Sequence, residues 1–194
     1  MLAETVADEL GISTTPAREG LQALRVEGFL ELIPRRGFQV AELNGDDIRD
    51  LFRIQALIAG ELAQRAASLG TTEDIAELEA LHHELIAAGS RGDTDLVEVK
   101  NHAFHRQVNL MARSRKMAWA LGLLSRYAPR AFYGTIPGWL EATMHDHSEI
   151  LRLIREHDAA GARAAMESHI GDSGELLAAF FDQRVADSGV NGPS

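Results

Sequence analysis

The chain of 194 residues contains no cysteine, so disulfide bonds and metal sites built on thiolates are excluded. It also lacks any apolar run near the roughly 18 residues that a membrane-spanning helix requires, and no signal peptide opens it. We therefore expect a cytoplasmic protein without a membrane partner. Positive charge is scarce, since 19 Lys and Arg against 29 Asp and Glu give a net charge of −10. A uniformly acidic surface repels nucleic acid, so any DNA contact would need its basic residues gathered on one face.

The first forty residues predict two short helices. Leu2, Val6 and Leu10 recur every four residues as one apolar stripe, and Gly11 would end this helix with a left-handed cap. A second helix is expected over Pro16–Glu27, because proline is tolerated in the first turn of a helix.

The expected second helix has two faces of different chemistry. Arg18, Gln22 and Arg25 share one stripe, and forked Arg and Gln side chains suit guanine and adenine edges in the major groove. The neighbouring apolar stripe, which would pack on the first helix, consists of Ala17, Leu21 and Leu24. Thr15 is expected to cap the first turn through its hydroxyl. The polar stripe thus favours direct DNA readout.

A basic hairpin is expected next. Phe29–Ile33 and Gly37–Val40 have the pattern of two strands, and Arg35 and Arg36 lie between them, where their guanidinium groups would contact phosphate or a minor groove. A plain helix pair followed by a solvated hairpin is the alternative.

These residues resemble a known family. LGISTTPAREGL at 10–21, EGFL at 27–30 and RRGFQV at 35–40 are similar to the winged-helix head of GntR-family bacterial transcription regulators. The resemblance covers roughly residues 1–41 and implies operator DNA as the partner. The DNA-binding residues that it implies are Thr14, Thr15, Arg18, Gln22, Arg25, Arg35, Arg36 and Gly37.

The head also departs from the family. Thr14 and Gln22 replace arginines, and Gly20 replaces an alanine at a cost of about 1 kcal/mol within a helix. Relatives carry a further amphipathic helix before this point, so we expect a truncated head with an incomplete core. Four arginines face six acids in residues 1–41. We therefore expect weak, salt-sensitive DNA binding that depends on a dimer.

From residue 46 onward the sequence predicts helices alone. Residues 42–45 form a polar linker, 46–184 a helical effector-binding and dimerisation domain, and 185–194 a disordered tail of turn residues. The expected helices are Asp46–Leu69, Thr72–Ala88, Asp93–Ala112, Lys116–Tyr127, Gly138–Glu156 and Ala159–Asp182. Their candidate N-caps are Thr72, Asp93 and Asp158. The expected buried stripe of the first of these helices is Leu51, Ile54, Ile58, Leu62 and Ala66. The predicted fold is mainly α, an incomplete winged helix-turn-helix head followed by an antiparallel all-α bundle.

The chemistry of the helical domain lies in its histidines. Asn101 and His105 are i, i+4 neighbours, and His147 and His169 fall on the last two helices, whose antiparallel packing would bring them together. Three imidazoles and an amide oxygen suit a divalent ion such as Zn²⁺, Ni²⁺ or Mn²⁺. Taken singly, each histidine also fits a capped or half-exposed helix position.

A second resemblance bears on this choice. NHAFH at 101–105, followed by His147 and His169, is similar to the all-helical (FCD-type) ligand-binding domain of the FadR-like branch of GntR regulators. The metal-binding version, with an Asp and three histidines, implies Asn101, His105, His147 and His169 as ligands and a small carboxylate as effector. The Asp is Asn101 here, which removes a negative charge and predicts weaker metal binding.

The effector end of the site departs too. Gln55 stands where relatives carry an arginine that pairs with a carboxylate. Either the effector is less acidic, or Arg126 or Arg130 supplies the charge. The other histidines are expected on the surface or just behind the ligands, with His102 and His145 flanking the site; they are His82, His83, His102, His145 and His157.

Two functions remain open at this stage. The first is a homodimeric transcription regulator, expected to be a repressor, that senses a small metabolite, an organic acid, near a metal. The alternative is a metal-dependent hydrolase or isomerase that uses His105, His147 and His169. An enzyme would need a general base beside the metal, and the sequence contains no HExxH, Ser–His–Asp or phosphate-loop pattern. The DNA-binding head favours the regulator, without an enzymatic activity.

Overall fold

The structure, a computed structural model, describes residues 1–127 and 136–190, and for residues 184–190 it describes the backbone alone. The chain divides into two compact units, Met1–Leu43 and Asn44–Ser194. The division falls within the stretch 42–45 that the sequence marks as a linker. No helix among the described residues is both long and apolar enough to cross a membrane.

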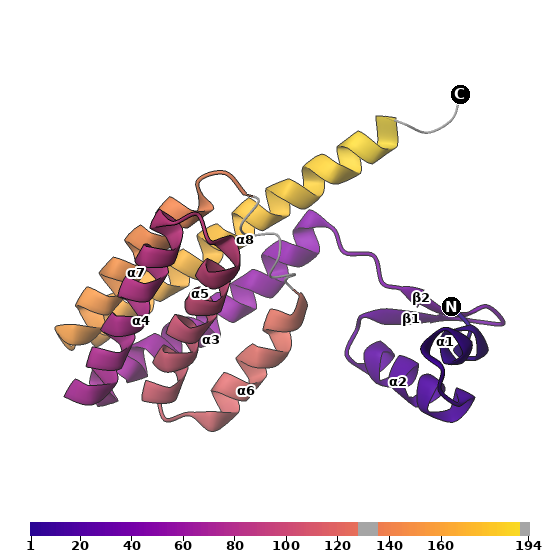
Figure 1. Ribbon diagram of the computed structural model, residues 1–194, viewed down its shortest axis with the longest axis horizontal. Helices are drawn as coiled ribbons and strands as arrows, with labels where there is room; N and C mark the ends of the chain where they lie inside the picture. Colours follow the sequence, from indigo (N-terminus) through magenta and orange to yellow (C-terminus); the bar gives the residue numbers. More distant parts are fainter. Residues whose placement is uncertain (128–135, 191–194) are drawn as a thin grey trace. The chain divides into compact units, whose positions relative to one another are not determined.

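The first unit contains two helices and a two-stranded antiparallel sheet (Figure 1). Leu30 pairs with Val40 and Ile33 with Gly37. The elements are α1 (Ala3–Leu10), α2 (Thr14–Val26), β1 (Leu30–Ile33) and β2 (Gly37–Val40). Gly11 ends α1 with a left-handed cap at φ 64°, as its sequence position predicts. Met1 pairs with Phe38, whose N–H donates to the Met1 carbonyl over 2.8 Å.

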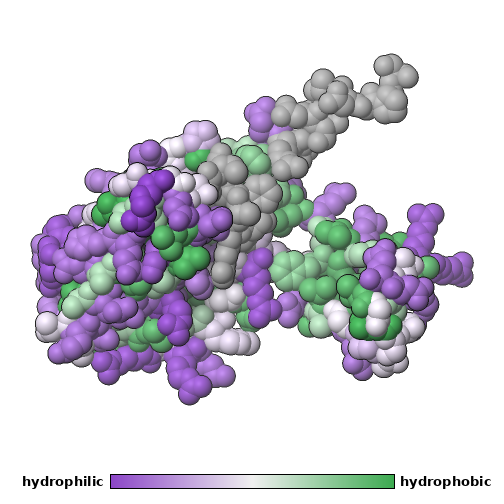
Figure 2. Space-filling view, in the orientation of Figure 1, coloured by the Kyte–Doolittle hydropathy of each residue, from purple (hydrophilic) through white to green (hydrophobic). Residues whose placement is uncertain are grey.

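The core of this unit differs from the expected apolar stripe. Leu2 and Leu10 are 50% and 65% exposed, whereas Ala3 and Ala7 are buried. Small alanines let α1 approach its neighbours closely. The buried face is therefore the one that carries Ala3 and Ala7, each next in sequence to a residue of the expected stripe. The core consists of Ala3, Leu21, Leu30 and Phe38, with Val6 packed against it. Apolar residues accordingly show on the visible face of this unit (Figure 2).

The second helix also starts differently from the prediction. It begins at Thr14, and Ser13 occupies the N-cap position without a side-chain cap bond. Thr15 is therefore inside the helix and the prediction that it caps the first turn is wrong. Of the stripe expected to pack on α1, Ala17 and Leu21 are buried, but Leu24 is 42% exposed.

The second unit is a helix bundle (Figure 1). Its elements are α3 (Gly45–Leu69), α4 (Thr72–Ser90), α5 (Thr94–Met111), α6 (Arg115–Leu124), the 3₁₀ turn η1 (Ser125–Tyr127), α7 (Trp139–Arg155) and α8 (Ala159–Val190). Helix α8 packs along α3 and α7, and α4 packs on α5 and α7. The last turns of α8 extend beyond the other helices (Figure 1).

Side-chain caps fix where these helices begin. Thr71 forms a capping box at the start of α4, so the cap precedes the predicted Thr72 by one residue. Asp93 accepts from the Leu96 N–H and Asp158 from the Gly161 N–H, as predicted. At the other end of the unit, α8 continues to Val190. The prediction of a disordered tail from residue 185 is therefore wrong for residues 185–190. Adding residues to an existing helix is cheap, which lets α8 continue through turn-forming residues.

Helix α3 packs against α8 through its small residues. A Cβ on Gly174 of α8 would overlap the Phe52 side chain, and a Cβ on Gly60 of α3 would overlap Glu167. The face of α3 toward the core is therefore rich in alanine, and Ile54 of the expected stripe is 48% exposed. Leu62 and Ala66 of that stripe are fully buried.

The close contact at Gly174 predicts a stability difference between two glycines of α8. Gly174→Ala should lower the free energy of unfolding by about 1–3 kcal/mol, because Phe52 must shift to admit the methyl group. Gly171→Ala meets no atom within 4 Å and should raise it by up to about 1 kcal/mol through helix propensity. Urea denaturation of both variants measures the effect. Equal stability of the two variants would contradict the close packing.

Candidate metal centre and nucleic-acid interface

Three histidines from three helices converge in the bundle. His105 lies on α5, His147 on α7 and His169 on α8. The Nε2 atom of His105 lies 3.3 Å from Nε2 of His147 and 3.3 Å from Nε2 of His169. One nitrogen from each ring lies within 4.8 Å of the others, close enough to hold one ion. The structure thus brings together the three histidines that the sequence singles out.

The packing of the core holds these rings in place. The Phe104 ring stacks on the His147 ring, with centroids 4.0 Å apart and planes tilted by 11°. Phe104 and His147 are fully buried, and His169 is buried. The tight corner before Asp158 turns α8 back along α7, which places His169 beside His147.

An acidic residue behind the rings sets the orientation of His169. The Oδ2 atom of Asp146 lies 3.0 Å from Nδ1 of His169. The His169 N–H therefore donates to the carboxylate, and the lone pair on Nε2 faces the other histidines. Sequence reasoning missed Asp146, although its position next to His147 was the available signal. Glu149, the other nearby acid, binds Arg152 instead.

The surroundings of Asn101 indicate whether the three histidines and this amide fit a metal ion. Its side-chain Oδ1 is buried and has no hydrogen-bond partner, one turn before His105 on the same helix. A buried amide oxygen without a donor is costly unless a cation or another donor meets it. Three imidazole nitrogens and an amide oxygen suit the borderline ions Zn²⁺, Ni²⁺ and Mn²⁺. The residues present therefore fit a divalent ion.

Burial keeps two of the ligand rings, His105 and His147, uncharged. It lowers the pKa of His105 to about 3, with a smaller contribution from repulsion by His169. Burial also holds the pKa of His147 well below its usual value. Neutral imidazole is the form that binds metal, so these two nitrogens are available at pH 7 without releasing a proton.

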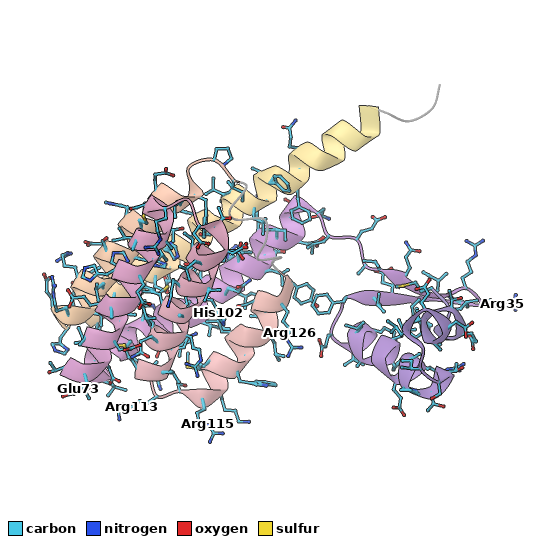
Figure 3. The ribbon with its side chains drawn as sticks, viewed as in Figure 1. Arg35, Glu73, His102, Arg113, Arg115 and Arg126 are labelled. Atoms are coloured by element: carbon cyan, nitrogen blue, oxygen red, sulfur yellow. The ribbon has the colours of Figure 1, made fainter. Side chains whose placement is uncertain are left out.

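The predicted effector residues have different surroundings. Gln55 is 5% exposed; its Oε1 accepts from the Ser125 hydroxyl over 3.3 Å, and its Nε2 has no partner. Arg126 is exposed at the end of α6, in the 3₁₀ turn (Figure 3). Arg130 lies outside the described residues.

Of the five remaining histidines, one is buried. His82 on α4 is 4% exposed and its Nε2 bonds to the Ser148 hydroxyl over 2.9 Å; burial lowers its pKa. It therefore lies behind the ligands and not on the surface. The exposed ones are His83, His102, His145 and His157. His102 follows Asn101 on α5 (Figure 3).

The predicted DNA-binding residues form an exposed set on the first unit. Arg18 on α2 is 64% exposed and pairs with Glu4 over 3.1 Å. Arg35 lies at the tip of the hairpin at a φ of 65° (Figure 3). The other exposed members are Thr14, Thr15, Gln22, Arg25 and Arg36, and Gly37 is half-buried. A reading helix beside a basic hairpin has the geometry of a winged DNA-binding head.

Known proteins share this arrangement. Residues 50–172 match the model of the FCD domain. The Glc operon transcriptional activator of Escherichia coli is 24% identical over 189 residues, which span 85% of this chain and 74% of that protein. The transcriptional regulator LutR of Bacillus subtilis is 22% identical, over 94% of this chain and 92% of that protein. The structure of E. coli McbR/YncC is similar with a TM-score of 0.72 and 23% identity, over 95% of this chain and 87% of that one.

The chain is a GntR-family regulator with an FCD domain.

As a member of this family, the protein is a transcription regulator and not an enzyme, because its relatives and structural neighbours are regulators. The structure of a GntR regulator from Pseudomonas syringae shares the fold with a TM-score of 0.61. The metal-dependent hydrolase or isomerase considered from the sequence has no support in these relatives.

The low pKa of the buried rings predicts acid sensitivity of the metal-free GntR regulator. Unfolded His105 takes up a proton near pH 6.5, but the folded ring does so only near pH 3. The unfolded state therefore binds more protons in this window, and stability present above pH 6.5 is lost as the pH falls. We expect each such ring to lower the free energy of unfolding by about 1.4 kcal/mol for each pH unit below 6.5.

Urea denaturation in EDTA between pH 7 and 5 measures the slope of the free energy of unfolding against pH. In this interval most carboxylates stay ionised and do not contribute to the slope. His105→Gln should flatten it, and His102→Gln, an exposed neighbour, should leave it as in the parent protein. A slope in His105→Gln equal to the parent's would contradict the assignment.

Proposed function

We propose that this regulator is a homodimeric repressor whose FCD domain senses a small carboxylate at a divalent metal centre. His105, His147 and His169 would hold the ion, with Asn101 as a weak fourth ligand. The observation that carries the proposal is the convergence of three histidine Nε2 atoms, together with a buried amide oxygen without a partner one turn before His105 on α5. The cation would supply a concentrated positive charge for an anionic effector.

The charge of the site supports an anionic effector. Three of the four ligands bring no charge, because burial lowers the pKa of His105 and His147 and the Asn101 amide is uncharged. A divalent ion held by such ligands would keep most of its charge, and a carboxylate effector would compensate that charge inside a low-dielectric core.

The amide of Gln55 suits an effector whose second polar group is neutral and not a carboxylate. Its buried Nε2 is a donor without a partner, which suits a hydroxyl or carbonyl oxygen. A guanidinium at this position would instead demand a second carboxylate. Arg126, and Arg130 outside the described residues, remain the cations that would serve a diacid.

The DNA-binding unit supports a dimer. Its residues 1–43 carry four arginines against seven acids, so one head gains little from phosphate contacts. Two heads on paired half-sites bind together with a far higher effective concentration. We propose repression as the output, because a dimer that occupies an operator blocks it without any further contact. The relatives' names include an activator, that of the Glc operon, and a repressor, RspR of E. coli.

The metal ligands predict opposite effects for two substitutions on α5. Asn101→Asp adds a charged oxygen and should tighten Zn²⁺, Ni²⁺ or Mn²⁺ binding on the order of tenfold, whereas His105→Gln should abolish it. Metal content after dialysis, by mass spectrometry, and thermal unfolding with added ion measure both, since a ligand of the folded state raises stability. Asn109→Asp, which adds the same charge two turns along α5, is the matched control.

The metal centre is wrong if the parent protein and Asn101→Asp both stay metal-free and neither unfolding temperature responds to the ion. In that case the histidines line a polar pocket, and hydrogen bonds alone hold the effector.

The DNA-binding face predicts two kinds of loss. Arg18→Ala should weaken operator binding by about 1–3 kcal/mol and relax sequence preference, because this side chain is assigned to a base edge. Arg36→Ala should weaken binding to all sequences and reduce the salt slope by about one, as for a phosphate contact. Fluorescence titrations on a selected operator and on random DNA, at several salt concentrations, separate the two.

Arg155→Ala, which removes one arginine from the helical unit, is the charge-matched control. Identical losses on operator and random DNA for Arg18→Ala and Arg36→Ala would show that α2 is not the reading helix.

A further inference from the structure

His147 lacks the partner that its neighbour His169 has. His169 donates from Nδ1 to Asp146, but the Nδ1 of His147 is buried and has no hydrogen-bond partner. A histidine that presents Nε2 to a metal carries its hydrogen on Nδ1, and this N–H nearly always donates to another group. A buried donor without an acceptor costs free energy, so the protein needs an acceptor at this point.

The hydrogen-bond chain behind His147 provides one. The Ser148 hydroxyl donates its only hydrogen to the Met144 carbonyl over 2.8 Å. Its oxygen can therefore only accept from Nε2 of His82, which lies 2.9 Å away. The neutral His82 ring then carries its hydrogen on Nε2, and its Nδ1 is a lone-pair acceptor. That Nδ1 is also buried and without a partner.

The two unpartnered nitrogens are complementary. One is the N–H donor of His147 and the other is the acceptor of His82, in rings whose centroids lie 6.2 Å apart. No direct hydrogen bond joins them. One water molecule can accept from the first nitrogen and donate to the second, over about 2.8 Å on each side, and so satisfy both groups.

We propose that His82 is a positioning residue for the metal centre, which orders a buried water against Nδ1 of His147 and so fixes Nε2 of His147 as the ligand atom. The relay runs from His147 through the water to His82, then to Ser148 and the Met144 carbonyl. The effect of this relay on metal binding rests on the metal centre proposed above. The relay itself is expected in the metal-free protein as well.

Metal-free protein tests the relay directly. Long-range ¹H–¹⁵N NMR of the imidazoles should find the hydrogen of His147 on Nδ1 and that of His82 on Nε2. Ser148→Ala leaves both rings in place but removes the acceptor that sets the His82 tautomer, and Ser148 is exposed, so the fold should tolerate it. This variant should show a mixture of tautomers at both rings. A ring that only fills the core would be unaffected.

Metal binding tests the consequence with Ni²⁺ alone as the probe. His82→Phe keeps the ring and removes both nitrogens, and should weaken Ni²⁺ binding by roughly 10–100-fold. His82→Gln, which retains a donor and an acceptor, should recover part of the loss. His83→Gln, at the exposed neighbouring position on α4, should bind Ni²⁺ as the parent does.

The outcomes distinguish the relay from the metal centre. A hydrogen on Nε2 of His147 in the parent protein, or unchanged Ni²⁺ affinity in His82→Phe, overturns the relay. If the parent binds no Ni²⁺ but shows the expected tautomers and their loss in Ser148→Ala, the relay stands and the proposed metal centre fails.

Discussion

The helical unit depends on packing three imidazole rings together where three helices meet. Each ring has two nitrogens, and each nitrogen needs a partner once water is excluded. The three Nε2 atoms face one another, so they need a shared ion or a shared hydrogen. The outer nitrogens need acceptors, which Asp146 provides directly for His169. The buried His82, whose Nδ1 also has no partner, adds a further unsatisfied nitrogen near this cluster.

The same requirement applies to two amide side chains. Asn101 and Gln55 both bury an amide atom that has no partner within the described residues. Each unsatisfied atom costs free energy, so the proposed ion and effector would stabilise the folded core.

The DNA-binding unit is subject to an electrostatic constraint. Its arginines are exposed, but Arg18 already pairs with Glu4, a contact that DNA must replace or share. Exposed pairs of this kind are weak, so the cost of replacement is small. The acidic surface elsewhere weakens nonspecific attraction to DNA, so in the proposed binding mode specificity would come from side chains of α2 and the hairpin.

Much of the secondary structure was predictable, because it depends on local chemistry. Asp93 and Asp158 mark helix starts since a carboxylate accepts from the first free N–H groups, and Gly11 ends α1 because it adopts positive φ. The predicted buried faces of α1 and α3 were partly wrong. Periodicity identifies an apolar stripe, but the choice between Leu2 and Ala3 depends on how closely the neighbouring element approaches.

The sequence by itself determined the order of elements, the family and the three histidines, because caps, turns and motifs are local patterns of side chains. The tertiary structure alone decided which groups stand behind those histidines. Asp146, His82 and the Ser125 partner of Gln55 come from other turns and other helices. Contacts between helices depend on their rotation and separation, which the packing of the whole core sets and no single stretch of sequence encodes.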